Sequence, residues 1–176
     1  MNKGVISILL LSIVAISCAL GFNYFTLSKP LQEVIESDYR NKGIDISVHY
    51  DNYINPKIMV FDVKNIDISA ISAADVFRVF WSYSNKLKDK EFDKVILSSK
   101  GQGKYYILGS HFKIMGREYG IQNPVYIVRT FPENVYTMGN NKAFGTWTGG
   151  LLGVTNKQME DFNKMSRVWF IDDALK

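Results

Sequence analysis

The chain has 176 residues, enough for one domain of ordinary size, and its composition of 47% hydrophobic, 22% charged and 14% aromatic residues excludes general disorder. The formal net charge of +4 is small, and the lysines and arginines are scattered among acids, so nucleic-acid binding is not expected. A single cysteine excludes a disulfide within the chain, so the domain must be stabilised by its core.

The most apolar run of the chain covers residues 5–25 and contains no charged side chain. Its length, about 21 residues, is close to the ~20 that a transmembrane helix needs. Lys3 ahead of the run and small residues near Ser17 and Ala19 also fit a secretory signal. We expect an anchor or a signal rather than a buried helix of the domain, because the run has no polar face for water.

The stretch AISC, residues 15–18, resembles the signal of bacterial lipoproteins, in which a small residue precedes a cysteine that becomes acylated. This resemblance implies lipid attachment at Cys18. Apolar residues continue beyond Cys18 to Phe25, however, and this continuation favours an uncleaved anchor. An uncleaved anchor, a lipoprotein and a cleaved secretory signal stay open, in that order of preference.

All three fates make residues 1–25 the anchor or signal and place residues 26–176 outside the cytoplasm. Lys3 precedes the apolar run and the next basic residue, Lys29, follows it, so the positive-inside rule gives a slight preference for this orientation. We therefore expect a bacterial envelope protein, attached to the membrane through its N-terminal segment, with its domain on the extracytoplasmic, periplasmic side.

Residues 26–176 are predicted to form a single α+β domain, a small and mostly antiparallel sheet with helices packed on it. A helix is expected over residues 27–43, capped by Ser28 and ended by Gly43. Residues 44–50 alternate between apolar and polar as a half-buried strand does, and residues 57–64 predict a second strand that pairs with the first as a hairpin.

Residues 72–90 predict the strongest helix of the domain, with Ser72 and Asp75 as a capping box. Two strands follow, at 92–99 and within 99–109, joined by a glycine-containing turn at KGQG. The strand before this helix and the strand after it are expected to form a βαβ crossover.

Three more elements are predicted in the last third of the chain. Residues 110–120 fit a short helix capped by Ser110. Residues 123–136 favour a strand, although Asn-Pro at 123–124 also suits the start of a helix. Residues 155–169 fit a final helix with Thr155 and Gln158 as its capping box.

Two stretches are candidates for binding. In FGTWTGGLLG, residues 144–153, four glycines surround Trp147, and the amides of Gly149 and Gly150 could hold an anion beside the indole. A loop that Trp147 anchors to the core is the favoured alternative. The second stretch, residues 125–136, combines residue types that dominate protein interfaces, although the same mixture fits a core edge. Its candidate residues are Tyr126, Arg129, Phe131 and Tyr136.

Other polar residues do not predict a catalytic or metal site, and no cofactor is expected. His49 and His111 lack the spacing of metal ligands and are expected on the solvated surface. The acidic pairs at 160–161 and 172–173 are expected on solvated helix faces, because adjacent helical residues point in different directions. KGQG lacks the spacing of a phosphate-binding loop.

Three segments, at residues 93–109, 119–136 and 146–163, resemble parts of small, uncharacterised bacterial proteins that are predicted lipoproteins or membrane-anchored proteins. The resemblance implies an envelope location and supplies no activity. The sequence therefore favours a membrane-anchored, non-enzymatic protein that binds another protein or an envelope component, as an inhibitor or immunity protein would. An envelope enzyme that uses the Trp147 loop and a structural subunit of a membrane complex are the alternatives, and the oligomeric state is not specified.

Overall fold

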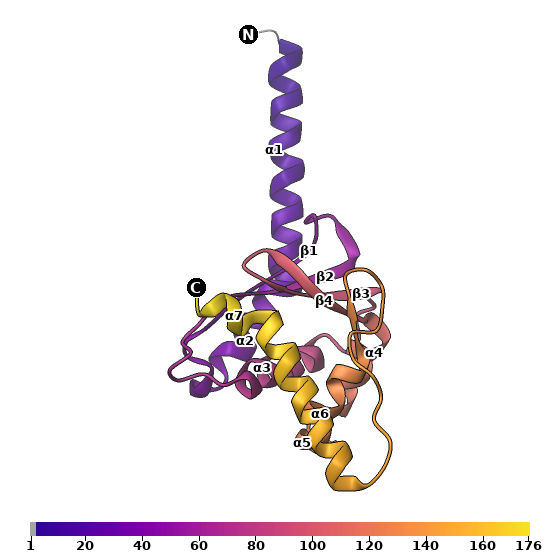
Figure 1. Cartoon of the computed structure of the whole chain (residues 1–176). Helices are drawn as coiled ribbons and strands as arrows, with labels where there is room; N and C mark the ends of the chain where they lie inside the picture. Colours follow the sequence, from indigo (N-terminus) through magenta and orange to yellow (C-terminus); the bar gives the residue numbers. More distant parts are fainter. Residues whose placement is uncertain (1–2) are drawn as a thin grey trace.

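The structure is a computed structural model that describes residues 3–176 (Figure 1). It confirms the predicted α+β fold: a long apolar helix precedes a five-stranded, mostly antiparallel sheet with helices packed on it. The strands are β1 (Ile44–Asp51), β2 (Asn55–Ile66), β3 (Lys94–Ser99), β4 (Gln102–Leu108) and β5 (Val135–Thr137).

The α-helices are α1 (Lys3–Asn23), α2 (Lys29–Glu36), α3 (Ala73–Lys86), α4 (Gly109–Glu118), α5 (Pro124–Thr130), α6 (Leu151–Ser166) and α7 (Asp172–Ala174). Two π-helical segments, η1 (Tyr24–Ser28) and η4 (Arg167–Ile171), and two 3-10 segments, η2 (Tyr39–Asn41) and η3 (Phe131–Asn134), join or extend them. Apart from the β2–α3–β3 unit, helices and strands occur in separate runs along the chain, as is typical of an α+β domain.

The sheet has the strand order β1-β2-β3-β4-β5. β1 pairs with β2 as an antiparallel hairpin, and β2 pairs with β3 in parallel with α3 between them, so the predicted hairpin and βαβ crossover are confirmed. Ser72 and Asp75 form the predicted capping box of α3. The KGQG stretch is the β3–β4 turn, where Lys100 and Gly101 have positive φ angles.

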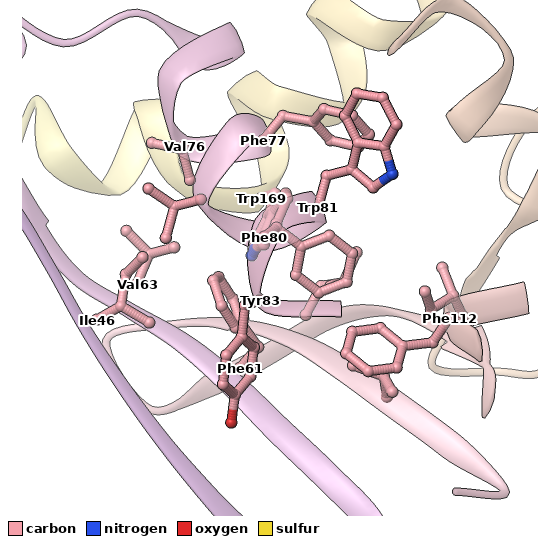
Figure 2. Close-up of a cluster of buried hydrophobic side chains, with 14 of the residues drawn as sticks. Ile46, Phe61, Val63, Val76, Phe77, Phe80, Trp81, Tyr83, Phe112 and Trp169 are labelled. Atoms are coloured by element: carbon pink, nitrogen blue, oxygen red, sulfur yellow. The ribbon is translucent and has the colours of Figure 1, made fainter. Parts of the chain in front are cut away.

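One face of the sheet packs against the helices, and aromatic side chains fill the space between the two layers. Phe61 of β2 lies 4.9 Å from Phe80 of α3, measured between ring centroids, and Phe80 lies 6.0 Å from Trp169 of η4 (Figure 2). The indole nitrogen of Trp169 donates to the carbonyl of Ser98 at 3.0 Å, which ties the C-terminal segment to β3. α2, α3 and α6 lie on this side of the sheet, whereas α1 rises from the other side (Figure 1).

The helix predicted over residues 27–43 is wrong at both ends. α1, η1 and α2 form one continuous helix, in which Ser28 has helical backbone angles and caps nothing, and the helix ends at Glu36. At η1 the amide of Lys29 donates to the carbonyl of Tyr24, five residues earlier. The apolar run therefore leads directly into the core, where Leu27 is buried.

This helix covers the outer edge of β1, the first strand of the sheet. Asn23 is 3% exposed, and its Oδ1 accepts a hydrogen bond of 2.7 Å from the amide of Tyr50. Its Nδ2 donates to the carbonyls of Tyr53, at 2.7 Å, and Ala19, at 2.8 Å. The hydroxyl of Ser28 donates to the carbonyl of Val48 at 3.4 Å. Backbone groups that an edge strand would leave unpaired are thus satisfied by side chains of the helix.

Three other expected boundaries are wrong. Residues 123–130 are not a strand, because Asn123 caps α5 by accepting from the amide of Val125. Within the predicted strand at 123–136, only the residues of β5 are extended. α6 begins at Leu151 and has no capping box at residue 155. α4 begins at Gly109 rather than after Ser110, and Gly109 lies so close to the loop before β3 that a Cβ on it would be 1.7 Å from the carbonyl oxygen of Phe92.

The Asn23 hydrogen bonds predict a clear stability effect. Asn23→Ala leaves the amide of Tyr50 and the carbonyl of Tyr53 without these partners, and should lower the free energy of unfolding by about 2–4 kcal/mol. Urea denaturation of the full chain in detergent micelles measures this loss. Thr26→Ala is the control, because Thr26 bonds only to the carbonyl of Phe22 in its own helix and should change stability by less than about 0.5 kcal/mol. Equal losses in the two variants would contradict this role of Asn23.

Candidate functional site

The Trp147 groove is an open hollow of about 550 Å³ between α5, the loop that precedes α6, and the first turns of α6. Four of the residues predicted to bind a ligand line it together: Tyr126, Arg129, Trp147 and Gly149. Gly149 has a φ of +132°, a conformation that favours glycine. Gly150 is the N-cap residue of α6 and follows directly. The structure therefore brings together the greater part of the two candidate stretches.

Trp147 is held in place by a buried carboxylate. Its indole nitrogen donates to Oδ2 of Asp161 at 2.7 Å, and the Nζ atom of Lys157 lies 5.9 Å from the ring centroid. Asp161 is 7% exposed, so the expectation that this acidic residue lies on a solvated helix face is wrong. The ring itself is 39% exposed, which leaves one face available for contact.

Arg129 is positioned by a chain of hydrogen bonds across the groove. Its Nη1 donates to Oε1 of Gln158, and Nε2 of Gln158 donates to Oε1 of Glu133 at 2.5 Å. The guanidinium carbon lies 5.2 Å from the ring centroid of Tyr126, a cation–π distance. Gln158 is buried, and it connects α6 to α5 and η3 instead of capping the last helix.

Two predicted binding residues lie elsewhere. Phe131 is buried in the core, with its ring 4.9 Å from that of Phe77. Tyr136 lies on β5 and stacks on Tyr106 of β4 at 5.2 Å. Both residues follow α5 in the chain, Phe131 at the start of η3 and Tyr136 on β5, so they do not share the side of α5 that carries Tyr126.

A second hollow, the apolar hollow, was not predicted. It has a volume of about 680 Å³ and lies between α3, the α4–α5 connection and α5. Its apolar lining is Phe77, Trp81, Tyr119, Pro124, Val125, Val128 and Met159. Because Val125 and Val128 face this hollow and Tyr126 and Arg129 face the Trp147 groove, α5 is a ridge between the two. The alternation of these residues on a helix is the signal that the strand interpretation obscured.

Large apolar side chains are exposed around both hollows. Leu151 and Leu152, at the start of α6, are 74% and 81% exposed, and Ile121 and Val125 are also exposed. These residues lie at the end of the domain opposite α1 (Figure 1). Exposed apolar residues gathered beside polar ones are typical of surfaces that bind a partner.

His111 is not the solvated residue that the sequence predicts. It lies in the first turn of α4, beside Phe131, and its Nε2 is buried and has no hydrogen-bond partner within residues 3–176. Burial, followed by the positive charge of Lys142, lowers the pKa of His111 to about 4, so the imidazole is neutral at pH 7. It lines a small cavity of about 200 Å³ together with Glu118 and Glu133. His49 lies on β1 and stacks on Tyr53 at 4.6 Å.

The acidic pair at 172–173 also departs from expectation, because Asp173 is buried. Its carboxylate pairs with Lys104 at 2.9 Å and with Lys176 at 2.8 Å, and these hydrogen bonds hold its pKa well below the usual range.

Among the described residues there is no group of three His, Cys, Asp or Glu side chains that could hold a metal ion. Cys18 is exposed on α1, far from the groove.

The bond between Trp147 and Asp161 predicts a stability effect at the groove. Trp147→Phe removes the donor and leaves a buried carboxylate without it, which should cost about 1–3 kcal/mol. Chemical denaturation of the full chain in micelles measures the change. Adding Asp161→Leu to the variant removes the unpaired carboxylate and should recover most of the loss. A Trp147→Phe variant as stable as the parent chain would show that the hydrogen bond does not hold the loop.

Comparison with known proteins gives no assignment for the site. No protein family, no curated protein and no solved structure matches this chain. Its function is therefore inferred from the sequence and from the geometry of the two hollows.

Proposed function

We propose that this protein is a membrane-anchored, non-enzymatic binding protein of the bacterial envelope, and that its partner is another protein. The observation that carries the proposal is the ridge formed by α5, with the apolar hollow on one side and the Trp147 groove on the other. A partner surface that carries apolar side chains beside an acidic or planar group fits this end of the domain. The apolar side chains would enter the apolar hollow, and the acidic or planar group would contact the Trp147 groove. An inhibitor or immunity protein would act in this way.

The membrane location is supported by the long N-terminal helix. Residues 4–36 form one helix, and by length and composition its apolar part could cross a membrane. The side chains of its apolar part are exposed to the surroundings, whereas those of α2 enter the core. Lipid would cover this exposed apolar surface.

We further propose that the apolar helix is retained rather than cleaved. Cys18 lies five residues before Asn23, about 8 Å along the helix, and there is no break between them. Cleavage ahead of Cys18 would expose a new helix end next to the contacts that close the sheet edge. Acylation of Cys18 is the alternative. The weak lysine asymmetry supports a domain on the extracytoplasmic side.

The polar groups of the Trp147 groove support recognition more than catalysis. Arg129 and Glu133 both bond to Gln158, and Asp161 bonds to Trp147, so these groups hold the walls of the groove in place. The enzyme alternative requires a nucleophile or base directed into the groove beside Trp147. No observation in residues 3–176 favours such a group.

Site-specific cross-linking tests the proposed binding end. A photoreactive amino acid replaces Leu152, the neighbour of Leu151 in the wall of the Trp147 groove, or Tyr39, an equally exposed residue on η2. We expect one defined protein to be cross-linked from position 152 and not from position 39, in cells that make the full chain. Identical patterns from the two positions, or none from position 152, would contradict the proposal.

The partner found in this way is then purified and its affinity measured. Val125→Ser and Leu152→Ser change exposed side chains and should weaken binding by about tenfold or more, without unfolding the domain. Tyr39→Ser is the matched control and should leave affinity unchanged. These variants are preferable to substitutions at Trp147 or Arg129, which also disturb Asp161 and Gln158.

A further inference from the structure

α2, α3 and α6 cover one face of the sheet (Figure 1), and we call the opposite face the open face, although Val60 and Tyr106 on it are themselves buried, at 8% and 5% exposed. Met59, Phe61 and Val63 of β2 point into the core, so the alternate residues of β2 point the other way. Following the strand register from β1 to β5, one row of the open face consists of His49, Val60, Ile96, Tyr106 and Tyr136. α1 rises from this same side (Figure 1).

A lysine–tyrosine cluster occupies the β3–β5 half of the open face. Tyr106 and Tyr136 stack with an interplanar angle of 13°. The Nζ atom of Lys94 lies 4.4 Å from the ring centroid of Tyr106, and that of Lys142 lies 4.5 Å from the centroid of Tyr136. Lys142 is bridged to Tyr136 across the strand pair, so both lysines belong to the same surface.

Neither lysine of the cluster is neutralised by a carboxylate in the described part of the chain. Lys94 donates to the side-chain oxygen of Asn140 at 3.2 Å, and Lys142 donates to the backbone carbonyl of Glu133. Of the carboxylates that alternate onto this face, Asp62 is buried and already paired with Lys64, and Asp45 and Asp51 lie on β1, at the opposite edge of the sheet from β5. The cluster therefore presents two positive charges that can attract an anion.

The geometry of α1 brings this face to the surface of a membrane. A helix of 21 residues is about 32 Å long, close to the ~30 Å of the hydrocarbon core, so the boundary falls near Asn23, where the helix meets the sheet. Exposed aromatic residues at this level, Phe22, Tyr24 and Phe25, fit the membrane boundary. The β1–β2 turn is bonded to Asn23 through Tyr53, and the next residue, Ile54, is 75% exposed.

We infer that the open face rests on the anionic lipid headgroups of the membrane that α1 enters, with Lys94 and Lys142 bound to lipid phosphates and Ile54 inserted at the boundary. The inference rests on the anchor role proposed above. Lipid is the favoured occupant because the same helix that would cross the membrane fixes the face beside it, within reach of the headgroups. The negative potential of anionic lipids complements the two free lysines.

An environment-sensitive fluorophore on the open face tests this inference in the full chain. The label is placed at Met138→Cys, whose side chain, like that of Ile96, lies beside Gly103 on the open face, or at Leu152→Cys, at the opposite end, both in a Cys18→Ser background. Each protein is incorporated into nanodiscs of phosphatidylcholine alone or with about 30 mol% phosphatidylglycerol. We expect the label at 138 to become roughly twofold brighter with anionic lipid, and the label at 152 to stay unchanged.

Charge variants distinguish lipid contact from other causes. Lys94→Gln with Lys142→Gln should abolish the response of the label at 138, as should about 0.5 M salt. Lys157→Gln with Lys164→Gln removes the same charge from α6 and should leave the response intact. A label at 138 that responds equally in both lipids, or in the Lys94/Lys142 variant, would overturn the inference.

The anchor role is tested separately in the same preparation. A chain that does not co-purify with nanodiscs contradicts the proposed anchor. A chain that co-purifies but whose label at 138 shows no response to anionic lipid contradicts only the lipid contact of the open face.

Discussion

The structure depends on the closure of its first sheet edge by the helix that carries the apolar run. β1 has no strand beyond it, and its outward amide at Tyr50 and carbonyl at Val48 bond instead to Asn23 and Ser28. An open edge of this kind invites pairing with other chains. The helix that closes it also buries Leu27 in the core, so the apolar segment and the domain form one structural unit.

This connection fixes how the domain would be presented at a membrane. With α1 crossing the bilayer, the open face of the sheet and the lysine–tyrosine cluster face the headgroups, while α5 and the start of α6 lie at the far end (Figure 1). A partner would then meet the apolar hollow and the Trp147 groove away from the lipid. The two proposed contacts use opposite ends of the domain, so they can act at the same time.

Local signals in the sequence predict most of the fold, and the errors arise where two local signals conflict. Ser28, the expected helix cap, lies inside a continuous helix instead, at the end of the π-helical turn that rearranges the backbone hydrogen bonds there. At α5 the β-branched residues favour a strand, but Asn123 caps the segment and it forms a helix. α6 brings Trp147 and Arg129, which belong to two separate candidate stretches, into one groove, whereas Phe131 lies in the core.

The most direct test of the account is the intact mass of the protein purified from its own membrane. If the apolar helix is a retained part of the fold, the mass includes the residues ahead of Cys18 and shows Cys18 unmodified. A chain that begins at an acylated Cys18, or at a new terminus near Leu20, would contradict the account.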